Sequence, residues 1–184
     1  MGPNVVAVWP PRRPVSVEPA VMGSSVMRPA CPSRGVWNDR AMSRTDEIVE
    51  QILTTYDTIT VVGASADPAK AAHDVPRYMR DHGWRIIPVN PKADELFGEK
   101  VYRTVGDIPE QVGLVDVFRP SAATPDIARQ AVAAGAGALW LQLGIASAEA
   151  REIAESAGLL YVEDRCLIIE QRRLGLRAPT TGQE

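Results

Sequence analysis

From about residue 58 onward, short apolar runs alternate with longer stretches in which apolar residues recur at helical spacing. The short runs are rich in β-branched and large apolar residues, and the first ends at Gly63, which is typical of buried strands. We expect five strands, at 58–62, 85–89, 114–118, 138–141 and 159–162. The stretches around them predict helices at about 45–54, 73–81, 125–134, 147–157 and 166–174.

Capping signals set the expected helix ends. Ser43 with Asp46 resembles a capping box, and Thr124 and Ser147 are expected N-caps. Pro76 falls inside a predicted helix, where we expect it in the first turn because its missing N–H is not needed there. The last helix is expected to bury a run of three apolar residues, Leu167, Ile168 and Ile169.

Strict alternation of apolar strands and helices with short connections predicts an α/β fold. We expect a Rossmann-like, doubly wound, mainly parallel five-stranded sheet with helices on both faces. Ligands of such sheets bind beyond the carboxyl ends of the strands, at the point where the strand order reverses. Residues that directly follow a strand are therefore the first candidates for a binding site.

Composition changes the picture at the N-terminus. The chain has 184 residues with a net charge of −3, but residues 1–42 carry seven of the fifteen prolines and a charge of +3, leaving −6 for the rest. We predict a disordered Pro/Arg-rich leader at 1–42, a ligand-binding domain at 43–176 and a flexible tail at 177–184. The prolines oppose the amphipathic helix of a transit peptide, and the apolar stretch is too short for a secretory signal. We interpret the segment as a dispensable leader or an over-extended start.

Several classes of function are disfavoured. The two cysteines are too few for a disulfide framework, and Cys31, Cys166, His73 and His82 share no metal-ligand spacing. No apolar run approaches the ~18 residues of a membrane span, and a net charge of −3 gives no reason to expect nucleic acid. The chain carries no G-x-S-x-G or Walker motif. We therefore expect a cytoplasmic protein without a metal site or an evident catalytic residue, and we expect His82 to bond to the last carbonyls of its helix.

Two candidate segments follow the first two strands. The first holds Gly63, Ala64, Ser65, Ala66, Asp67, Pro68 and Lys70. Its small residues would let backbone N–H groups approach a phosphate, although a plain strand–helix turn has the same pattern. The second holds Asn90, Pro91 and Lys92. NAD-binding folds place an acid there for the ribose hydroxyls. A lysine instead suits a ribose phosphate, as in NADP or coenzyme A, or is simply a solvated surface residue.

Two more segments follow the third and fourth strands. In the first, Arg119 can offer a planar fork to a pyrophosphate, and Phe118 or Pro120 can flank an adenine. The alternative is that Phe118 is core and Arg119 pairs with an acid such as Asp116. In the second, Gln142 is an amide handle between Leu141 and Leu143, or a buried glutamine bonded to a neighbouring loop.

As an ordered set, these motifs resemble those of the small bacterial coenzyme A-binding proteins. The motifs are Val62–Ser65 with Pro68 and Lys70, Pro88–Pro91, Gly98 with Tyr102, Val117–Pro120, Ala134–Gly135, Trp140–Gly144 and Asp164–Cys166. The resemblance covers roughly residues 45–174. The family is a single Rossmann-like domain, similar to the coenzyme A-binding domain of the succinyl-CoA synthetase α subunit and of NDP-forming acyl-CoA synthetases.

The resemblance implies a ligand and contact residues. In the related domain, the turn after the first strand contacts the coenzyme, and that turn corresponds to residues 65–68 here. A lysine after the second strand of that domain also contacts it, and Lys92 lies within one residue of the matching position. The segment after the fourth strand contributes too, and it corresponds to 141–143. The synthetase's phosphorylated histidine lies in a further domain with no counterpart in these residues, so the resemblance implies binding of coenzyme A or an acyl-CoA without synthetase activity. The alternatives are an NADP-dependent oxidoreductase, or the coenzyme A-binding subunit of a larger synthetase-like complex. A homo-oligomer or a partner subunit fits either.

Overall fold

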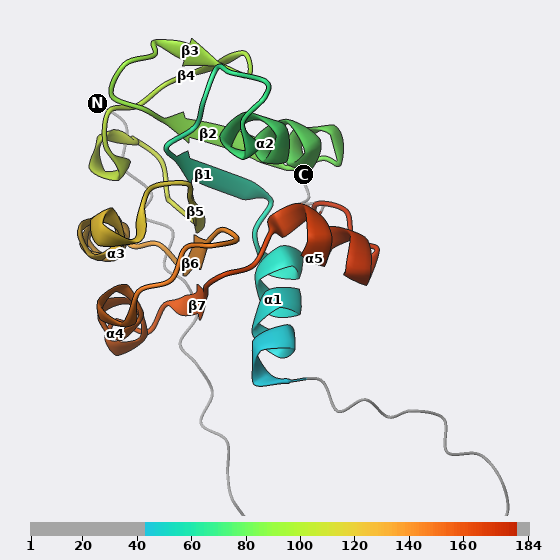
Figure 1. The fold of residues 1–184 in the computed structure, drawn as a ribbon, viewed down its shortest axis with the longest axis vertical. Coiled ribbons are helices and arrows are strands. Elements are labelled where there is room, and N and C mark those ends of the chain that lie inside the picture. The colour runs from blue at the N-terminus through green and yellow to red at the C-terminus, as the bar shows by residue number, and fades with distance from the viewer. Residues whose placement is uncertain (1–42, 180–184) are drawn as a thin grey trace, which may run out of the picture. The chain divides into compact units, whose positions relative to one another are not determined.

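The computed structural model describes residues 43–179. Its centre is a sheet of five parallel strands in the order β2-β1-β5-β6-β7 (Figure 1). The strands are β1 (Thr58–Val62), β2 (Arg85–Val89), β5 (Leu114–Val117), β6 (Ala138–Leu141) and β7 (Leu160–Val162). The predicted Rossmann-like α/β fold is confirmed. The strand order reverses between β1 and β5, so the expected switch point lies where these two strands end.

Both faces of the sheet are covered, which explains why the strands read as continuous apolar runs. Helices α1 (Arg44–Thr55), α2 (Ala71–Asp81) and α5 (Leu167–Leu174) lie on one face, and α3 (Thr124–Ala133) and α4 (Ala148–Ser156) on the other (Figure 1). Alternate residues of β1 supply the two cores. Ile59 and Val61 join the first cluster, and Val62 joins the second.

Most expected caps are present. The side chain of Ser43 accepts from the backbone N–H of Asp46, and the Asp46 carboxylate accepts from that of Ser43, which completes a capping box. Ser147 accepts from the N–H of Ala150 at the start of α4. The expectation for Thr124 is wrong: it is the first residue of α3, and its hydroxyl donates to the Ser121 carbonyl of the preceding 3-10 turn.

The expected position of Pro76 is also wrong. Helix α2 begins at Ala71 rather than at 73, which puts Pro76 in the second turn, where a helix normally uses the N–H that proline lacks. The expected burial of residue 169 fails for a different reason. Leu167, Glu170 and Gln171 form the inward stripe of α5 at helical spacing, so Ile169 turns outward and is 56% exposed.

Residues 90–112 contain elements that the hydrophobic pattern does not signal. A two-stranded antiparallel hairpin joins β3 (Glu95–Leu96) to β4 (Glu99–Lys100). Phe97 and Gly98 turn between them with positive φ, and a 3-10 turn follows at Val105–Asp107. Two-residue strands are too short to show a periodicity. The predicted leader at 1–42 and residues 180–184 of the predicted tail lie outside the described residues.

Candidate ligand-binding site at the carboxyl ends of the strands

The loops after β1 and β5 meet at Gly63. Gly63 has a φ of +93°, and a Cβ placed on it would lie 3.0 Å from Cδ of Arg119. A larger residue would therefore be strained by its backbone conformation and would collide with the arginine stem. The N–H of Gly63 donates to the Val89 carbonyl at the end of β2, and that of Phe118 to the Val62 carbonyl. Glycine thus allows the candidate segments to converge on the switch point.

The loop after β1 is internally bonded. The backbone N–H of Asp67 donates to the Ser65 hydroxyl at 3.1 Å, and that of Ala69 to the Asp67 carboxylate at 3.0 Å. These two N–H groups therefore already have partners, contrary to a turn that offers all of them to a phosphate. Lys70 occupies the N-cap position of α2 without a side-chain capping bond, and its ammonium lies 3.7 Å from the Asp67 carboxylate, with both side chains exposed. Ala66 and Pro68 are exposed at the tip.

Asn90 ties the second loop to the first. Its Nδ2 donates to the Ala64 carbonyl at 2.6 Å, and its Oδ1 accepts from the backbone N–H of Lys92 at 2.7 Å. The residue that stands where NAD-binding folds carry a ribose-binding acid is therefore engaged in holding two loops together. Pro91 and Lys92 are exposed, and the Lys92 ammonium has no carboxylate partner within residues 43–179.

The segment after β5 divides between core and solvent. Phe118 is half-buried and packs against the core beneath α1, α2 and α5, as the core alternative expected. Arg119 and Pro120 are exposed. Arg119 makes no ion pair with any described residue, so the alternative pairing with Asp116 is absent. The stem of Arg119 therefore lies beside Gly63, and its guanidinium has no ion-pair partner among the described residues.

Asp116 is occupied by Gln142 instead. Gln142 is buried, and its Nε2 donates to both carboxylate oxygens of Asp116 on the neighbouring strand, at 3.0 and 3.1 Å. Gln142 is therefore buried, as the alternative expected, but its amide nitrogen bonds to a strand carboxylate and not to a neighbouring loop. Burial raises the pKa of the fully buried Asp116 to about 8, although hydrogen bonds from Gln142 and the Val117 backbone lower it. The side chain of Leu141 is buried in the core and that of Leu143 is 63% exposed.

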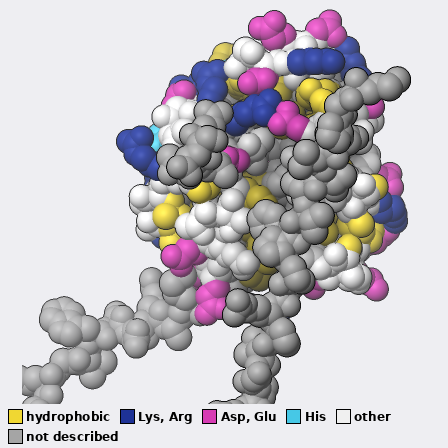
Figure 2. All heavy atoms as spheres, turned by 180° about the vertical axis from the view of Figure 1, so that it is seen from behind, with side chains coloured by type: hydrophobic (Ala, Val, Ile, Leu, Met, Phe, Trp, Pro, Cys, Tyr) yellow, Lys and Arg dark blue, Asp and Glu magenta, His cyan; other side chains and the backbone are white. Residues whose placement is uncertain are grey.

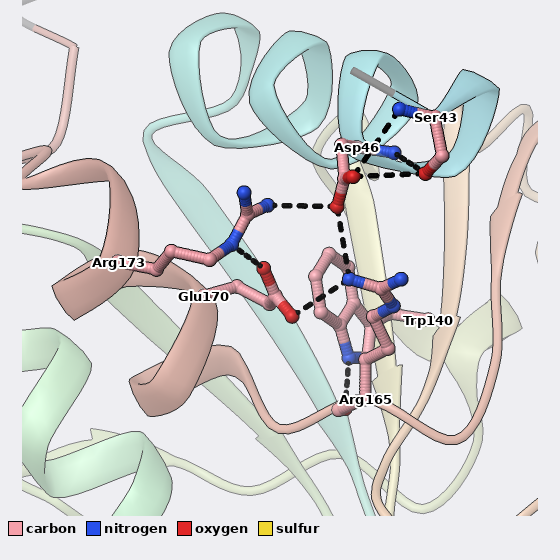
Figure 3. Close-up of polar contacts among 6 residues, drawn as sticks. All are labelled: Ser43, Asp46, Trp140, Arg165, Glu170 and Arg173. Atoms are coloured by element: carbon pink, nitrogen blue, oxygen red, sulfur yellow. Dashed lines mark hydrogen bonds and ion pairs between the residues drawn. The ribbon is translucent and has the colours of Figure 1, made fainter. Parts of the chain in front are cut away.

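A network of four charges fixes the segment after β7 against α1 and α5 (Figure 3). Arg165 donates to Asp46 at 3.1 Å and to Glu170 at 3.0 Å, and Arg173 bonds to the same two carboxylates. Beneath it, the indole N–H of the buried Trp140 donates to the Arg165 carbonyl at 2.6 Å. The charges cancel, so this network stabilises the end of β6 and leaves no net charge for a ligand.

The charge available to a ligand is local rather than general. Basic and acidic side chains lie intermingled on the face that Figure 2 shows. Two hollows of about 340 and 430 Å³ open elsewhere, against the segments 104–110 and 100–103, and none of the sixteen predicted site residues lines either. Most of the candidate site residues are exposed or half-buried at the strand ends. Within residues 43–179 no cluster of three or more His, Cys, Asp or Glu side chains is placed to hold a metal ion.

The histidines and Cys166 hold structural positions. Nδ1 of His82 lies 2.8 Å from the Tyr78 carbonyl, as expected for a residue at the helix end. Nδ1 of His73 lies 2.9 Å from the Ser65 carbonyl, a contact that the sequence did not reveal because eight residues separate the two. Cys166 is half-buried at the N-cap of α5.

No described helix has the length and apolar character needed to cross a membrane.

Comparisons with known proteins show relatives in sequence and in fold. The sequence is 34% identical over 119 residues to the uncharacterized protein YneT of Bacillus subtilis, covering 65% of this chain and 88% of that one. A hypothetical protein from Pyrococcus horikoshii superimposes with a TM-score of 0.70 at 37% identity, covering 80% of this chain and all of the other. An ADP-forming acetate–CoA ligase of Methanocaldococcus jannaschii is 26% identical over 66% of this chain, which spans only 18% of the ligase.

The match to a known domain family is more extensive than any single motif. Residues 57–172 match the CoA binding domain family, from the residue before β1 to the last turn of α5. This range includes the whole five-stranded sheet and all four candidate segments. The chain therefore belongs to the CoA binding domain family.

Proposed function

We propose that this protein binds coenzyme A or an acyl-CoA across the carboxyl ends of β1, β2, β5 and β6. The observation that carries the proposal is a pair of exposed cations that follow β2 and β5, at the edge of the sheet where the strands end. Lys92 and Arg119 stand on different loops that both contact the segment after β1, and neither has a carboxylate partner among the described residues. Exposed cations held without counter-charges fit a ligand that brings its own phosphates.

The two cations have different expected partners. Lys92 follows β2, where dinucleotide folds contact the ribose, so we assign it to the 3′-phosphate on the ribose of coenzyme A. Arg119 lies against Gly63 at the switch point, so we assign its planar fork to the pyrophosphate. We assign the exposed Leu143 to the pantetheine arm, because the Gln142 amide and the Leu141 side chain are buried. Direct ligand contacts from that segment are therefore expected from Leu143 and the backbone.

Calorimetric titration tests the proposal. We expect coenzyme A to bind the full chain with micromolar or tighter affinity. Arg119→Ala should weaken binding about tenfold or more, since a charge-assisted hydrogen bond contributes roughly 1.5–3 kcal/mol. Arg129→Ala is the matched control, because Arg129 is an exposed arginine whose partners are Asp126 and Glu149. Absence of heat with both coenzyme A and acetyl-CoA, in protein shown to be folded, would reject the proposal.

A truncated ligand tests the assignment of Lys92. 3′-Dephospho-coenzyme A lacks only the ribose phosphate, so Lys92→Ala should weaken coenzyme A about tenfold and change the affinity for the dephospho form little. Lys100→Ala is the control, because that ammonium lies 5.3 Å from the centre of the Tyr102 ring and belongs to no candidate segment. An equal loss for both ligands would show that Lys92 does not read the ribose phosphate.

NADPH discriminates the alternative function. NADPH carries a ribose 2′-phosphate where coenzyme A carries a 3′-phosphate, and a lysine after β2 can hold either one. Lys92 by itself therefore does not distinguish NADPH from coenzyme A. Tighter binding of NADPH than of coenzyme A in the same titration would favour the NADP-dependent oxidoreductase.

Co-purification from cells tests whether the domain also serves as a subunit of a larger synthetase-like assembly. A solitary protein in extract would contradict that role.

A further inference from the structure

Helix α2 carries a proline where a regular helix would use a backbone N–H. Pro76 is buried in the second turn of α2. In an uninterrupted helix, the N–H of this residue would donate to the carbonyl of Ala72, four residues earlier. Proline has no N–H, so that carbonyl is left without its helical partner. It accepts instead from the backbone N–H of Ser65, at 3.1 Å, in the loop after β1.

The same loop residue is held a second time by α2. Nδ1 of His73 lies 2.9 Å from the carbonyl oxygen of Ser65. A carbonyl oxygen only accepts, so Nδ1 carries the hydrogen of this bond. The imidazole packs against Phe97, with the ring centres 5.1 Å apart, which fixes its orientation. The N–H and the C=O of Ser65 are thus both bonded to the first turn of α2.

We propose that Pro76 and His73 are positioning residues for the ligand loop 63–70. Pro76 acts by withholding a hydrogen, which frees the Ala72 carbonyl for Ser65, and His73 acts by donating one to the Ser65 carbonyl. Neither belongs to the four candidate segments, and the inference rests on the proposed binding of coenzyme A. A loop fixed before the ligand arrives loses less conformational freedom on binding, so the two residues raise affinity through preorganisation.

The replacement of Pro76 by alanine separates this role from simple packing. Alanine supplies the missing N–H, which competes with the Ser65 N–H for the Ala72 carbonyl and weakens the bond that holds Ser65. Alanine is also a far better helix former than proline. The proposal therefore predicts that Pro76→Ala keeps or raises the midpoint of thermal unfolding while it weakens coenzyme A binding about fivefold, the factor for one neutral hydrogen bond. A packing role predicts a lower midpoint and unchanged affinity.

Variants of His73 give an independent measurement. His73→Phe keeps a ring against Phe97 but removes the donor, so affinity should again fall about fivefold. His73→Asn should recover it, because the amide nitrogen of asparagine is bonded to Cγ, as Nδ1 is in histidine. Pro109→Ala and His82→Phe are the controls. Pro109 precedes the amino end of β5, and His82 bonds a helix carbonyl at the other end of α2.

The experiment combines calorimetry with amide exchange in the full chain. We expect the Ser65 amide to exchange faster in Pro76→Ala than in the wild type, together with the loss of affinity for coenzyme A. Wild-type affinity in both Pro76→Ala and His73→Phe, or an unchanged Ser65 exchange rate in Pro76→Ala, would overturn the inference while the proposed function stands. A wild-type protein that does not bind coenzyme A would remove the proposed function and this inference with it.

Discussion

The buried carboxyl group of Asp116 should make the fold lose stability as pH rises. Burial raises its pKa to about 8, against opposing hydrogen bonds from Gln142 and the Val117 backbone, and an aspartate in an unfolded chain has a pKa of about 3.9. Between these values the unfolded chain releases a proton that the folded protein retains. The contribution of Asp116 is therefore fully present below about pH 4 and is lost as pH rises toward 8.

The expected magnitude follows from the separation of the two pKa values. The free energy of unfolding should fall by about 1.4 kcal/mol for each pH unit within this window, less steeply near its ends. From pH 5 to pH 8 the accumulated loss is about 3–4 kcal/mol. Asp116 is fully buried, so screening by solvent does not reduce this figure much.

The test compares the free energy of unfolding of the wild type with that of Asp116→Asn. Urea titrations followed by tryptophan fluorescence give both values at each pH unit from 5 to 8. The variant is neutral throughout, and an asparagine amide can exchange hydrogen bonds with that of Gln142. The difference between the two proteins cancels other titrating groups, such as Asp46, whose pKa is lowered by its hydrogen bond with Ser43. Relative to the variant, the wild type should weaken steadily as pH rises. Parallel curves, or a wild type that gains on the variant, would refute the reasoning.

Three further outcomes are expected. The hydroxyl of Thr60 is buried without a hydrogen-bond partner among the described residues, so Thr60→Val should raise the free energy of unfolding by about 1 kcal/mol in urea titrations, and a loss would show an unseen partner. A Cβ on Gly137 would lie 1.9 Å from the Tyr56 hydroxyl oxygen; Gly137→Ala should cost about 1–3 kcal/mol, and Tyr56→Phe should recover part of it unless the collision lies elsewhere. Coenzyme A affinity should fall between 50 mM and 500 mM salt, because Lys92 and Arg119 are exposed, and a salt-independent affinity would contradict an electrostatic site.

The sequence located the sheet well because each strand is buried on both faces. Ile59 and Val61 face one core and Val62 the other, so the whole strand is apolar and its limits are visible without neighbours. Helix boundaries were less accurate. Pro76 suggested a later start for α2, because a proline is normally tolerated only in the first turn of a helix. The sequence did not show that the N–H of Ser65, outside the helix, bonds to the carbonyl that proline leaves without a donor.

The candidate site divides in the same way. The position after a strand identified all four segments, because parallel strands bring their carboxyl ends to one edge. Which side chains remain free at that edge was not visible. From its position after a strand, Gln142 was a candidate to bond a ligand through its amide. In the structure that amide bonds to Asp116, which lies 26 residues earlier in the sequence. For Arg119 the sequence left two possibilities, a pyrophosphate contact or a pair with the same aspartate, and among the described residues its guanidinium is unpaired.

The sequence by itself determined the alternation of strands and helices, the two-sided burial of the sheet and the small-residue loop after β1, because hydrophobic period and turn chemistry are local properties. Only the tertiary structure decided the strand order and the choice of polar partners. Arg165 pairs with Asp46 across 119 residues, and Ser65 with Ala72 and His73. Several donors and acceptors of equal chemistry compete for each such contact, and the packing of helices on the sheet selects among them by bringing one pair within hydrogen-bond distance and separating the rest.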